Sequence, residues 1–538
     1  MMTLLLMFAK IFLFGVLYFA GRQFNIVNSD QKNKIMKKIF IISSVILSFI
    51  IDKSFAQNTE EITLIKKQCD AGYTAGQKGD YTLQKKYGED ALSMAKKINF
   101  KEGMPCAYDE IASALHHFGN TPAALENATS ALRIREELHD TLGMGSSYNN
   151  IANLYVGNGQ DSLASIYYVK SFEISKNSGN KFGKAINLCN MANQANKQGK
   201  NPEALEKYSS AFQIGEEIGS EYIIEICSRS FGHIYMEQGR CSEALAKFLS
   251  ALNIAQEPEI LDKRTISNCY YNIARIYDLE SNYSEALKNY SEGLKISEQM
   301  VYISDMVNTY NYMAVIYELE GDHTNSLKYS TKALNISQGK QYQEGMVDAY
   351  NDIAFIQGNL GSYDALLTNA KSALAIAVVI GYKEGLVDAY NNLETFYEKE
   401  INYPLAMNYS RSALKIADSI GYTIVVADSY NNIGNIYNKQ SHLDSALQNY
   451  FTALKIANEG SFKKCGRYKE GIVDAYNNIG SVYIKRHKLD MALNNYYSAL
   501  TISKLEFNYE YKKGIEEACK NIRLIYKMKS LQQPQCKE

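Results

Sequence analysis

Two regularly spaced sets of polar residues are the strongest candidates for chemistry in this chain. Aspartates recur in four copies, each followed three residues later by an asparagine: Asp348, Asp388, Asp428 and Asp474, then Asn351, Asn391, Asn431 and Asn477. A spacing of three residues places both members on one face of a helix. An asparagine amide both donates and accepts hydrogen bonds, so it can pair with any extended peptide backbone. The aspartates would favour basic side chains or an N-terminal amine.

Other polar residues extend this surface along the chain. They are Asn149, Asn153, Asn193, Asn311 and Asn435, with Arg229, His233 and Arg275 toward the N-terminal half. The surface is therefore expected to be acidic at one end and mixed at the other. Two structural interpretations stay open. An aspartate in a first turn stabilises its helix by about 0.3–1 kcal/mol through the helix dipole, and the adjacent asparagines Asn150, Asn272, Asn392, Asn432 and Asn478 could bond the loop of the preceding repeat.

No combination of residues predicts catalysis, a metal site or a cofactor. The seven histidines are scattered, and no phosphate-binding loop, GxSxG, HExxH or CxxC motif occurs. The chain is therefore expected not to be an enzyme. A net charge of −1 argues against nucleic acid as the partner. Cys227 and Cys269 occupy equivalent positions of adjacent copies, about 8–10 Å apart if their helices stack, so we interpret them as buried thiols.

These residues belong to a unit that recurs about every forty residues. The apolar residue that closes each copy is Leu92, Leu132, Phe172, Phe212, Leu252, Leu294, Leu334, Leu374, Leu414, Leu454 and Leu500. Within the copy at 430–457, apolar residues recur at helical spacing before and after a short turn at 441–444. Each copy is thus predicted to be helix A, turn, helix B. Repetition at this period indicates a solenoid, in which each unit packs only on its neighbours.

Small residues recur at one position of each helix. Helix A carries Ala112, Ala152, Ala192, Gly232, Ala274, Ala314, Ala354, Gly434 and Gly480, and helix B carries Ala124, Ala164, Ala204, Ala244, Ala286, Ala406, Ala446 and Ala492. Small side chains let the two helices approach closely. With the flanking tyrosines and the closing Ala-Leu, this pattern resembles the tetratricopeptide repeat family. The period of forty is similar to the long repeats of kinesin light chains.

The resemblance implies an all-α fold: a right-handed α-solenoid superhelix of about eleven helix-turn-helix repeats plus a C-terminal capping helix. The array would span residues 62–514 and the cap residues 515–529, followed by a tail at 530–538. It also implies that helix A lines the concave side, where members of this family commonly bind extended peptides. Two residues depart from the pattern, Glu394 on a helix A and Leu366 on a helix B. They indicate either local repacking or, for Glu394, a functional carboxylate.

The N-terminus carries features of export. Residues 36–56 have a basic start, an apolar core and a Ser-Phe-Ala ending, typical of a signal peptide cleaved after Ala56, with a linker at 57–61. Residues 1–35 are a doubtful extension, either upstream of the true start at Met36 or containing a membrane segment at 4–20. No later segment is expected to cross a membrane. The predicted location is the bacterial periplasm or cell envelope.

These patterns favour an exported repeat scaffold that binds a protein or peptide on its concave helix A surface. The alternative is a sensory module of a bacterial signalling system whose output domain is on another chain. The identity of the partner and the oligomeric state do not follow from the sequence.

Overall fold

The computed structural model describes residue 37 and residues 59–76, 79–258, 262–459, 469–506 and 512–529. Within these ranges all regular structure is helical and no strand occurs, which confirms the predicted all-α class. The predicted signal peptide, the doubtful segment before it and the tail at 530–538 lie outside the described residues, apart from residue 37.

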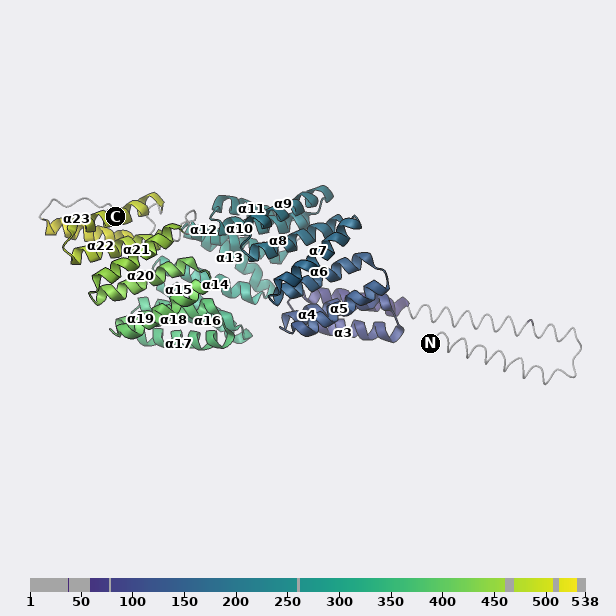
Figure 1. Cartoon of the computed structure of the whole chain (residues 1–538). Helices are drawn as coiled ribbons and strands as arrows, with labels where there is room; N and C mark the ends of the chain where they lie inside the picture. Colours follow the sequence, from purple (N-terminus) through teal and green to yellow (C-terminus); the bar gives the residue numbers. More distant parts are fainter. Residues whose placement is uncertain are drawn as a thin grey trace, which may run out of the picture. The chain divides into compact units, whose positions relative to one another are not determined.

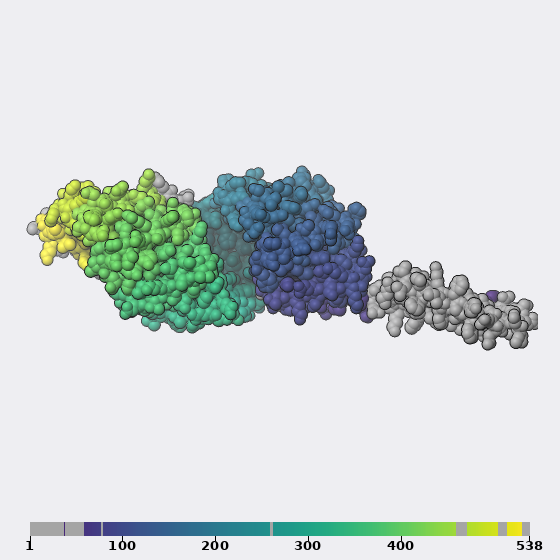
Figure 2. Space-filling model, turned by 60° about the horizontal axis from the view of Figure 1, so that its bottom comes forward, coloured from purple at the N-terminus to yellow at the C-terminus, as the bar shows by residue number. Residues whose placement is uncertain are grey.

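The chain divides into two compact units, Met1–Gln198 (unit 1) and Gly199–Glu538 (unit 2). Unit 1 contains helical residues 59–76, α3 (Tyr81–Ile98), η2 (Lys101–Gly103), α4 (Met104–His117), α5 (Thr121–Glu137), α6 (Thr141–Gly157), α7 (Asp161–Asn177) and α8 (Lys181–Lys197). Figure 2 shows their side chains, coloured purple to blue, packed into one continuous surface.

Unit 2 contains the remaining helices (Figure 1). They are α9 (Asn201–Ile218), α10 (Glu221–Glu237), α11 (Cys241–Ala255), α12 (Lys263–Leu279), α13 (Tyr283–Met300), α14 (Ile303–Leu319), α15 (His323–Lys340), α16 (Gln343–Asn359), α17 (Tyr363–Ile380), α18 (Lys383–Lys399), α19 (Tyr403–Ser419), α20 (Thr423–Lys439), α21 (Leu443–Glu459), α22 (Lys469–Lys485), α23 (Leu489–Glu506) and α24 (Lys512–Met528).

The helices alternate as the repeats predict. Helix A of each repeat is residues 59–76 or an even-numbered helix from α4 to α22, and helix B is the odd-numbered helix that follows. In the pairs α6–α7, α12–α13 and α20–α21, helix A packs closely along its helix B. The final helix α24 packs on α22 and α23, as a cap does.

A short turn joins helix A to helix B, and it contains a residue in the left-handed backbone conformation. The turn after α6 contains Gly159 at φ 69°, and the turn after α16 contains Gly361 at φ 74°. Glycine adopts this conformation without a steric penalty. Asparagine or aspartate then caps several of the next helices. The Asn120 side chain, for example, accepts a hydrogen bond from the Ala123 backbone N–H at 3.3 Å.

The small residue on helix A makes room for a ring on helix B. A Cβ atom added to Gly434 would lie 2.6 Å from the Tyr450 ring, and one added to Gly480 would lie 2.7 Å from the Tyr496 ring. Both rings are fully buried. In the repeats that carry a ring at this position of helix B, packing therefore requires a small residue on helix A.

The two departures from this pattern are matched by changes in the opposite direction. A Cβ atom on Gly358 would lie 2.8 Å from Cδ1 of Leu366, so the missing side chain at Gly358 provides the space that the larger Leu366 occupies. Ser410 stands where the next repeat has Tyr450, in the repeat that carries the larger Glu394. Glu394 and Ser410 are both buried, and burial raises the pKa of Glu394 to about 8. This pairing favours local repacking over a separate functional site.

One helix passes a length and composition test for a membrane span. By length and composition, α17 is apolar enough to cross a membrane, with a mean hydropathy of 1.3. In unit 2, however, α17 is the helix B of its repeat and packs between α16 and α18. Its Ala370, Ala373 and Ala377 are fully buried there. The buried alanines of α17 thus pack against neighbouring helices of the repeat array.

Candidate functional site

The helix A side of each unit is the side on which successive repeats approach most closely. In unit 2, α14 contacts α16, α16 contacts α18, and α20 contacts α22, and in unit 1 α4 contacts α6 and α6 contacts α8. No comparable contact joins successive B helices within the described ranges. Helix A therefore lines the inner side of the row of repeats. We call the surface formed by the A helices of one unit its A face.

Three of the four asparagines in the row, Asn351, Asn431 and Asn477, do not present their amides to this surface. Nδ2 of Asn351 donates to the Gly385 carbonyl at 3.0 Å, and Nδ2 of Asn477 donates to the Gly514 carbonyl at 3.0 Å. Asn431 makes the same bond to Gly471 at 3.3 Å. All three asparagines are buried. The expectation that they face a groove is wrong: each joins its own helix A to the third residue of the next helix A.

The neighbouring asparagines have a related role. Nδ2 of Asn392 donates to the backbone carbonyl of Asn351 at 3.1 Å, 41 residues earlier. The bond reaches the preceding helix A rather than the preceding loop. Of the remaining predicted amides, Asn391 is partly exposed, Asn311 is buried, and Asn435 accepts a hydrogen bond from the Tyr450 hydroxyl at 2.7 Å.

The aspartates, in contrast, do reach the A face. Asp388 is exposed, and Asp348, Asp428 and Asp474 are partly exposed. On α16 and α18 they form an acidic patch, which consists of Glu344, Asp348, Asp352, Glu384 and Asp388. Within the described ranges, none of these five carboxylates forms an ion pair with a lysine or arginine.

The three aspartates of the acidic patch have raised pKa values, chiefly because their packed surroundings shield them from water. Burial raises the pKa of Asp348 to about 7, a hydrogen bond from Tyr382 opposes this, and Asp388 adds to it. The packed surroundings raise the pKa of Asp388 to about 6, although its carboxylate still reaches water, and Glu384 adds to the effect. The pKa of Asp352 is raised further, by burial and by the same two aspartates. The fold therefore resists ionisation of these aspartates, and a cation brought close to them would favour it.

A cationic cluster occupies the A face at α10 and α12. Burial lowers the pKa of His233 to about 4, and the neighbouring guanidinium groups of Arg229 and Arg275 lower it further. His233 is therefore neutral near pH 7. Its ring packs edge-on against Phe248, with centroids 5.0 Å apart.

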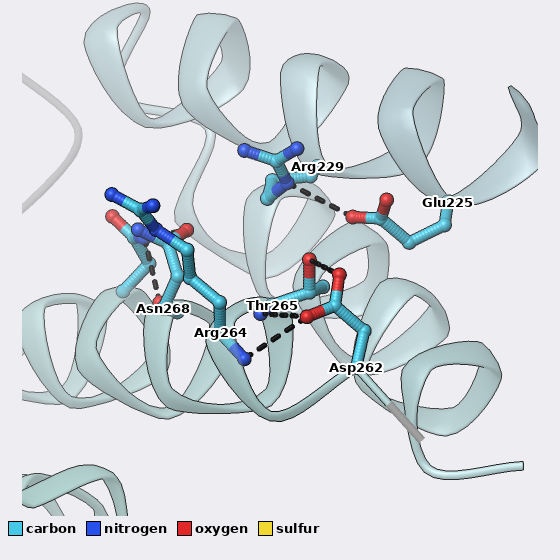
Figure 3. A network of polar contacts seen from close by, with 7 residues as sticks. Glu225, Arg229, Asp262, Arg264, Thr265 and Asn268 are labelled. Atoms are coloured by element: carbon cyan, nitrogen blue, oxygen red, sulfur yellow. Dashed lines mark hydrogen bonds and ion pairs between the residues drawn. The ribbon is translucent and has the colours of Figure 1, made fainter. Parts of the chain in front are cut away.

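Both arginines in this cluster keep hydrogen-bond donors for a ligand. Nε of Arg229 donates to Glu225 at 2.9 Å, and Figure 3 shows its two terminal nitrogens without a partner among the residues drawn. The nearby Asp262 carboxylate accepts from two backbone N–H groups at the start of α12, so it is engaged in capping. The guanidinium of Arg275 lies over the rings of Tyr271 and Tyr312, at 5.8 and 5.7 Å from their centroids.

In unit 1, the predicted asparagines gather around a pocket. A cavity of about 210 Å³ lies between α6, α7 and α8, lined by Asn153, Val156, Tyr168, Asn190, Asn193, Gln194 and Lys197. The Tyr168 hydroxyl donates to Oδ1 of Asn153 at 2.5 Å, and Nδ2 of Asn190 donates to Oδ1 of Asn149 at 2.7 Å. These two bonds do not use the side-chain N–H groups of Asn153 or the side-chain carbonyl of Asn190. The pocket therefore offers a ligand one hydrogen-bond donor and one acceptor.

Sequence reasoning missed several of these groups. Asp352, Glu344 and Glu384 complete the acidic patch, and Asn190 and Tyr168 complete the pocket. Asp352 stands where the next two repeats carry asparagine, so an alignment of the repeats would have revealed the extra charge. The pocket residues lie on three different helices, and no single spacing connects them.

Comparison with known proteins agrees with the repeat assignment. A tetratricopeptide repeat model matches residues 227–299, and a second one matches residues 145–178 and 427–459. No curated protein matches the chain by sequence.

Several solved structures resemble this chain at low sequence identity. BtubC (BKLC) from P. vanneervenii is 20% identical, with 40% of this chain and 89% of that chain covered and a TM-score of 0.34. The apo form of RapI is 14% identical, with 52% and 100% covered and a TM-score of 0.45. The apo quorum sensor NprR from B. thuringiensis is 13% identical, with 64% and 97% covered and a TM-score of 0.46.

The forty-residue period, the alternating A and B helices and the matched segments lead to one assignment. Three segments of the chain, residues 145–178, 227–299 and 427–459, are tetratricopeptide repeats by sequence, and the alternating helices continue the same repeat between and beyond them.

Proposed function

We propose that this chain is an exported scaffold that binds an extended segment of a protein partner on its A face. The observation that carries the proposal is the acidic patch on α16 and α18, five carboxylates with no lysine or arginine paired to them within the described ranges. Because the carboxylates lie close together, their ionisation destabilises the folded chain. A partner that brings lysine, arginine or an amino terminus to the patch would neutralise them.

The other features of the A face support binding by a protein segment. The pocket of unit 1 offers a donor on Asn153 and an acceptor on Asn190. An extended backbone supplies the complementary carbonyl and N–H groups. The cationic cluster of unit 2 suits acidic side chains, because guanidinium groups pair well with carboxylates. The partner would then carry basic groups at one part of the A face and acidic groups at another.

Capture from a cell-envelope extract tests this function. The immobilised full chain is compared with a variant carrying Asp348→Asn and Asp388→Asn. The matched control carries Asp364→Asn and Glu206→Gln, two exposed carboxylates on B helices, so that both variants lose the same charge. We expect a protein retained by the parent and the control to be lost from the A face variant. Equal retention by all three would show that the acidic patch is not the binding surface.

The export part of the proposal rests on the pattern at residues 36–56. Mass spectrometry of the mature protein from a fractionated bacterial host would test it. We expect a mature N-terminus at Gln57 in the periplasmic or envelope fraction. An intact N-terminus in the cytoplasmic fraction would contradict export without affecting the assignment of the binding surface.

A further inference from the structure

Two cysteines lie in one core cluster on adjacent A helices of unit 1. Cys69 is in helical residues 59–76 and Cys106 is in α4. Cys69 is buried in a cluster with Ile65, Ala91, Ala95 and Ala107, and the partly buried Cys106 packs against the same cluster. Their helices are neighbours on the A face and are separated by all of α3 in the sequence.

Two close contacts fix the register of these helices. A Cβ atom added to Gly103 would lie 3.1 Å from Cγ2 of Ile65, and one added to Gly72 would lie 3.3 Å from Cγ of Glu110. Both contacts join residues 38 apart, and they lie on either side of Cys69. Cys69 therefore lies opposite the stretch that contains Cys106. Because Gly72 has no side chain, the two helices approach closely there.

Both cysteines are free thiols in the structure, and each shifts the pKa of the other. The neighbouring Cys106 thiol lowers the pKa of Cys69, and the Cys69 thiol raises the pKa of Cys106. Burial and the nearby Asp109 and Glu110 oppose ionisation of both sulfurs. The two thiols therefore lie in one cluster, on helices that approach closely at Gly72, and they are near enough to influence each other's ionisation.

We propose that Cys69 and Cys106 form a disulfide that ties the first repeat to the second. One sulfur, as thiolate, attacks a disulfide such as that of oxidised glutathione, forms a mixed disulfide and releases one glutathione thiolate. The second sulfur attacks the first, which closes the protein disulfide and releases the second glutathione. The two protons of the cysteines pass to the two glutathione thiolates. The step is independent of the proposed partner binding, and an exported location would supply the oxidising conditions.

Such a bond has a clear consequence in a repeat array. A terminal repeat contacts a neighbour on one side only, so it is the first to open. A covalent link between helical residues 59–76 and α4 would hold the first helix A in place. The bond therefore stabilises the N-terminal end of the array, which includes the start of the A face.

Mass spectrometry after controlled oxidation tests the proposal. The folded full chain is equilibrated with oxidised glutathione, alkylated in denaturant and digested without reduction. We expect one cross-linked peptide that contains Cys69 and Cys106. Cys227 and Cys269 serve as the matched control pair: both thiols are buried, burial raises the pKa of Cys269 to about 12, and we expect both to be alkylated.

Thermal melting separates the bond from nonspecific oxidation. We expect oxidation to raise the Tm of the parent and leave the Tm of Cys106→Ser unchanged, with circular dichroism confirming that the variant is helical. Recovery of Cys69 and Cys106 as separate alkylated or glutathionylated peptides would overturn the proposal. A link that forms only after unfolding in urea would overturn it as well.

Discussion

Replacing Asp348 by asparagine should stabilise the folded chain above neutral pH. Burial and the neighbouring carboxylates raise the pKa of Asp348 from 3.8 to about 7. An acid with a higher pKa in the folded chain than in the unfolded chain binds its proton more tightly when folded, so its ionisation destabilises the fold. The destabilisation is absent below 3.8, grows as the pH rises toward about 7, and is complete above that value.

The magnitude follows from the same two pKa values. Their difference corresponds to about 4 kcal/mol at about 1.36 kcal/mol per pH unit. The carboxylate of Asp348 is partly open to water, which reduces the effect. We therefore expect Asp348→Asn to raise the free energy of unfolding by about 1–2 kcal/mol at pH values above the raised pKa. Asparagine keeps an acceptor for the Tyr382 hydroxyl, so no buried partner is lost.

Urea unfolding followed by circular dichroism measures this effect across the pH range. The control is Glu206→Gln, an exposed carboxylate in the interior of α9, which should change stability by no more than a few tenths of a kcal/mol. The gain for Asp348→Asn should vanish as the pH falls to about 4, because the parent is then protonated. A variant that is less stable than the parent at high pH, or a gain that is independent of pH, would refute the reasoning.

Two further substitutions test the packing of the repeats by thermal and urea unfolding. Asn477→Ala removes a buried hydrogen bond to the Gly514 carbonyl and should destabilise the cap by about 1–2 kcal/mol. Asn391→Ala, at a partly exposed position, should destabilise the fold less. Equal effects of the two substitutions would contradict the role of Asn477 in joining α22 to α24. Gly480→Val would place side-chain atoms against the buried Tyr496 ring and should destabilise the fold by about 1–3 kcal/mol, and an unchanged Tm would show that the ring can move aside.

The repeat architecture could be predicted because each element is specified locally. The forty-residue period and the helical spacing of apolar residues predict the alternating A and B helices, and the small residue at Gly434 allows the close approach that the pattern predicts, here by the Tyr450 ring. The compensations at Glu394 and Leu366 were also present in the sequence. They would have appeared if each residue had been compared with its partner position in the same repeat, Ser410 and Gly358.

The candidate site could be predicted only in part. Helical spacing predicts that Asp348 and Asn351 lie on one side of their helix, but it does not give the offset between neighbouring helices. That offset decides that Asn351 reaches the Gly385 carbonyl and is buried, while Asp388 stays open to water. Packing between repeats, such as that of Cys69 and Cys106 in one core cluster, depends on the same offset. No periodic pattern in the sequence predicts it.

Site-specific photo-cross-linking tests the central claim, that partners bind the A face, most directly. Phe355 on helix α16 and Phe451 on helix α21 are both exposed, at 55% and 48%, so a photoreactive phenylalanine analogue can replace either without disturbing the core. Phe355 borders a small cavity beside Asp352, whereas Phe451 lies on a helix B. After illumination in an envelope extract, we predict a protein adduct from position 355 and none from position 451. An adduct from position 451 alone, or equally from both, would contradict binding on the A face.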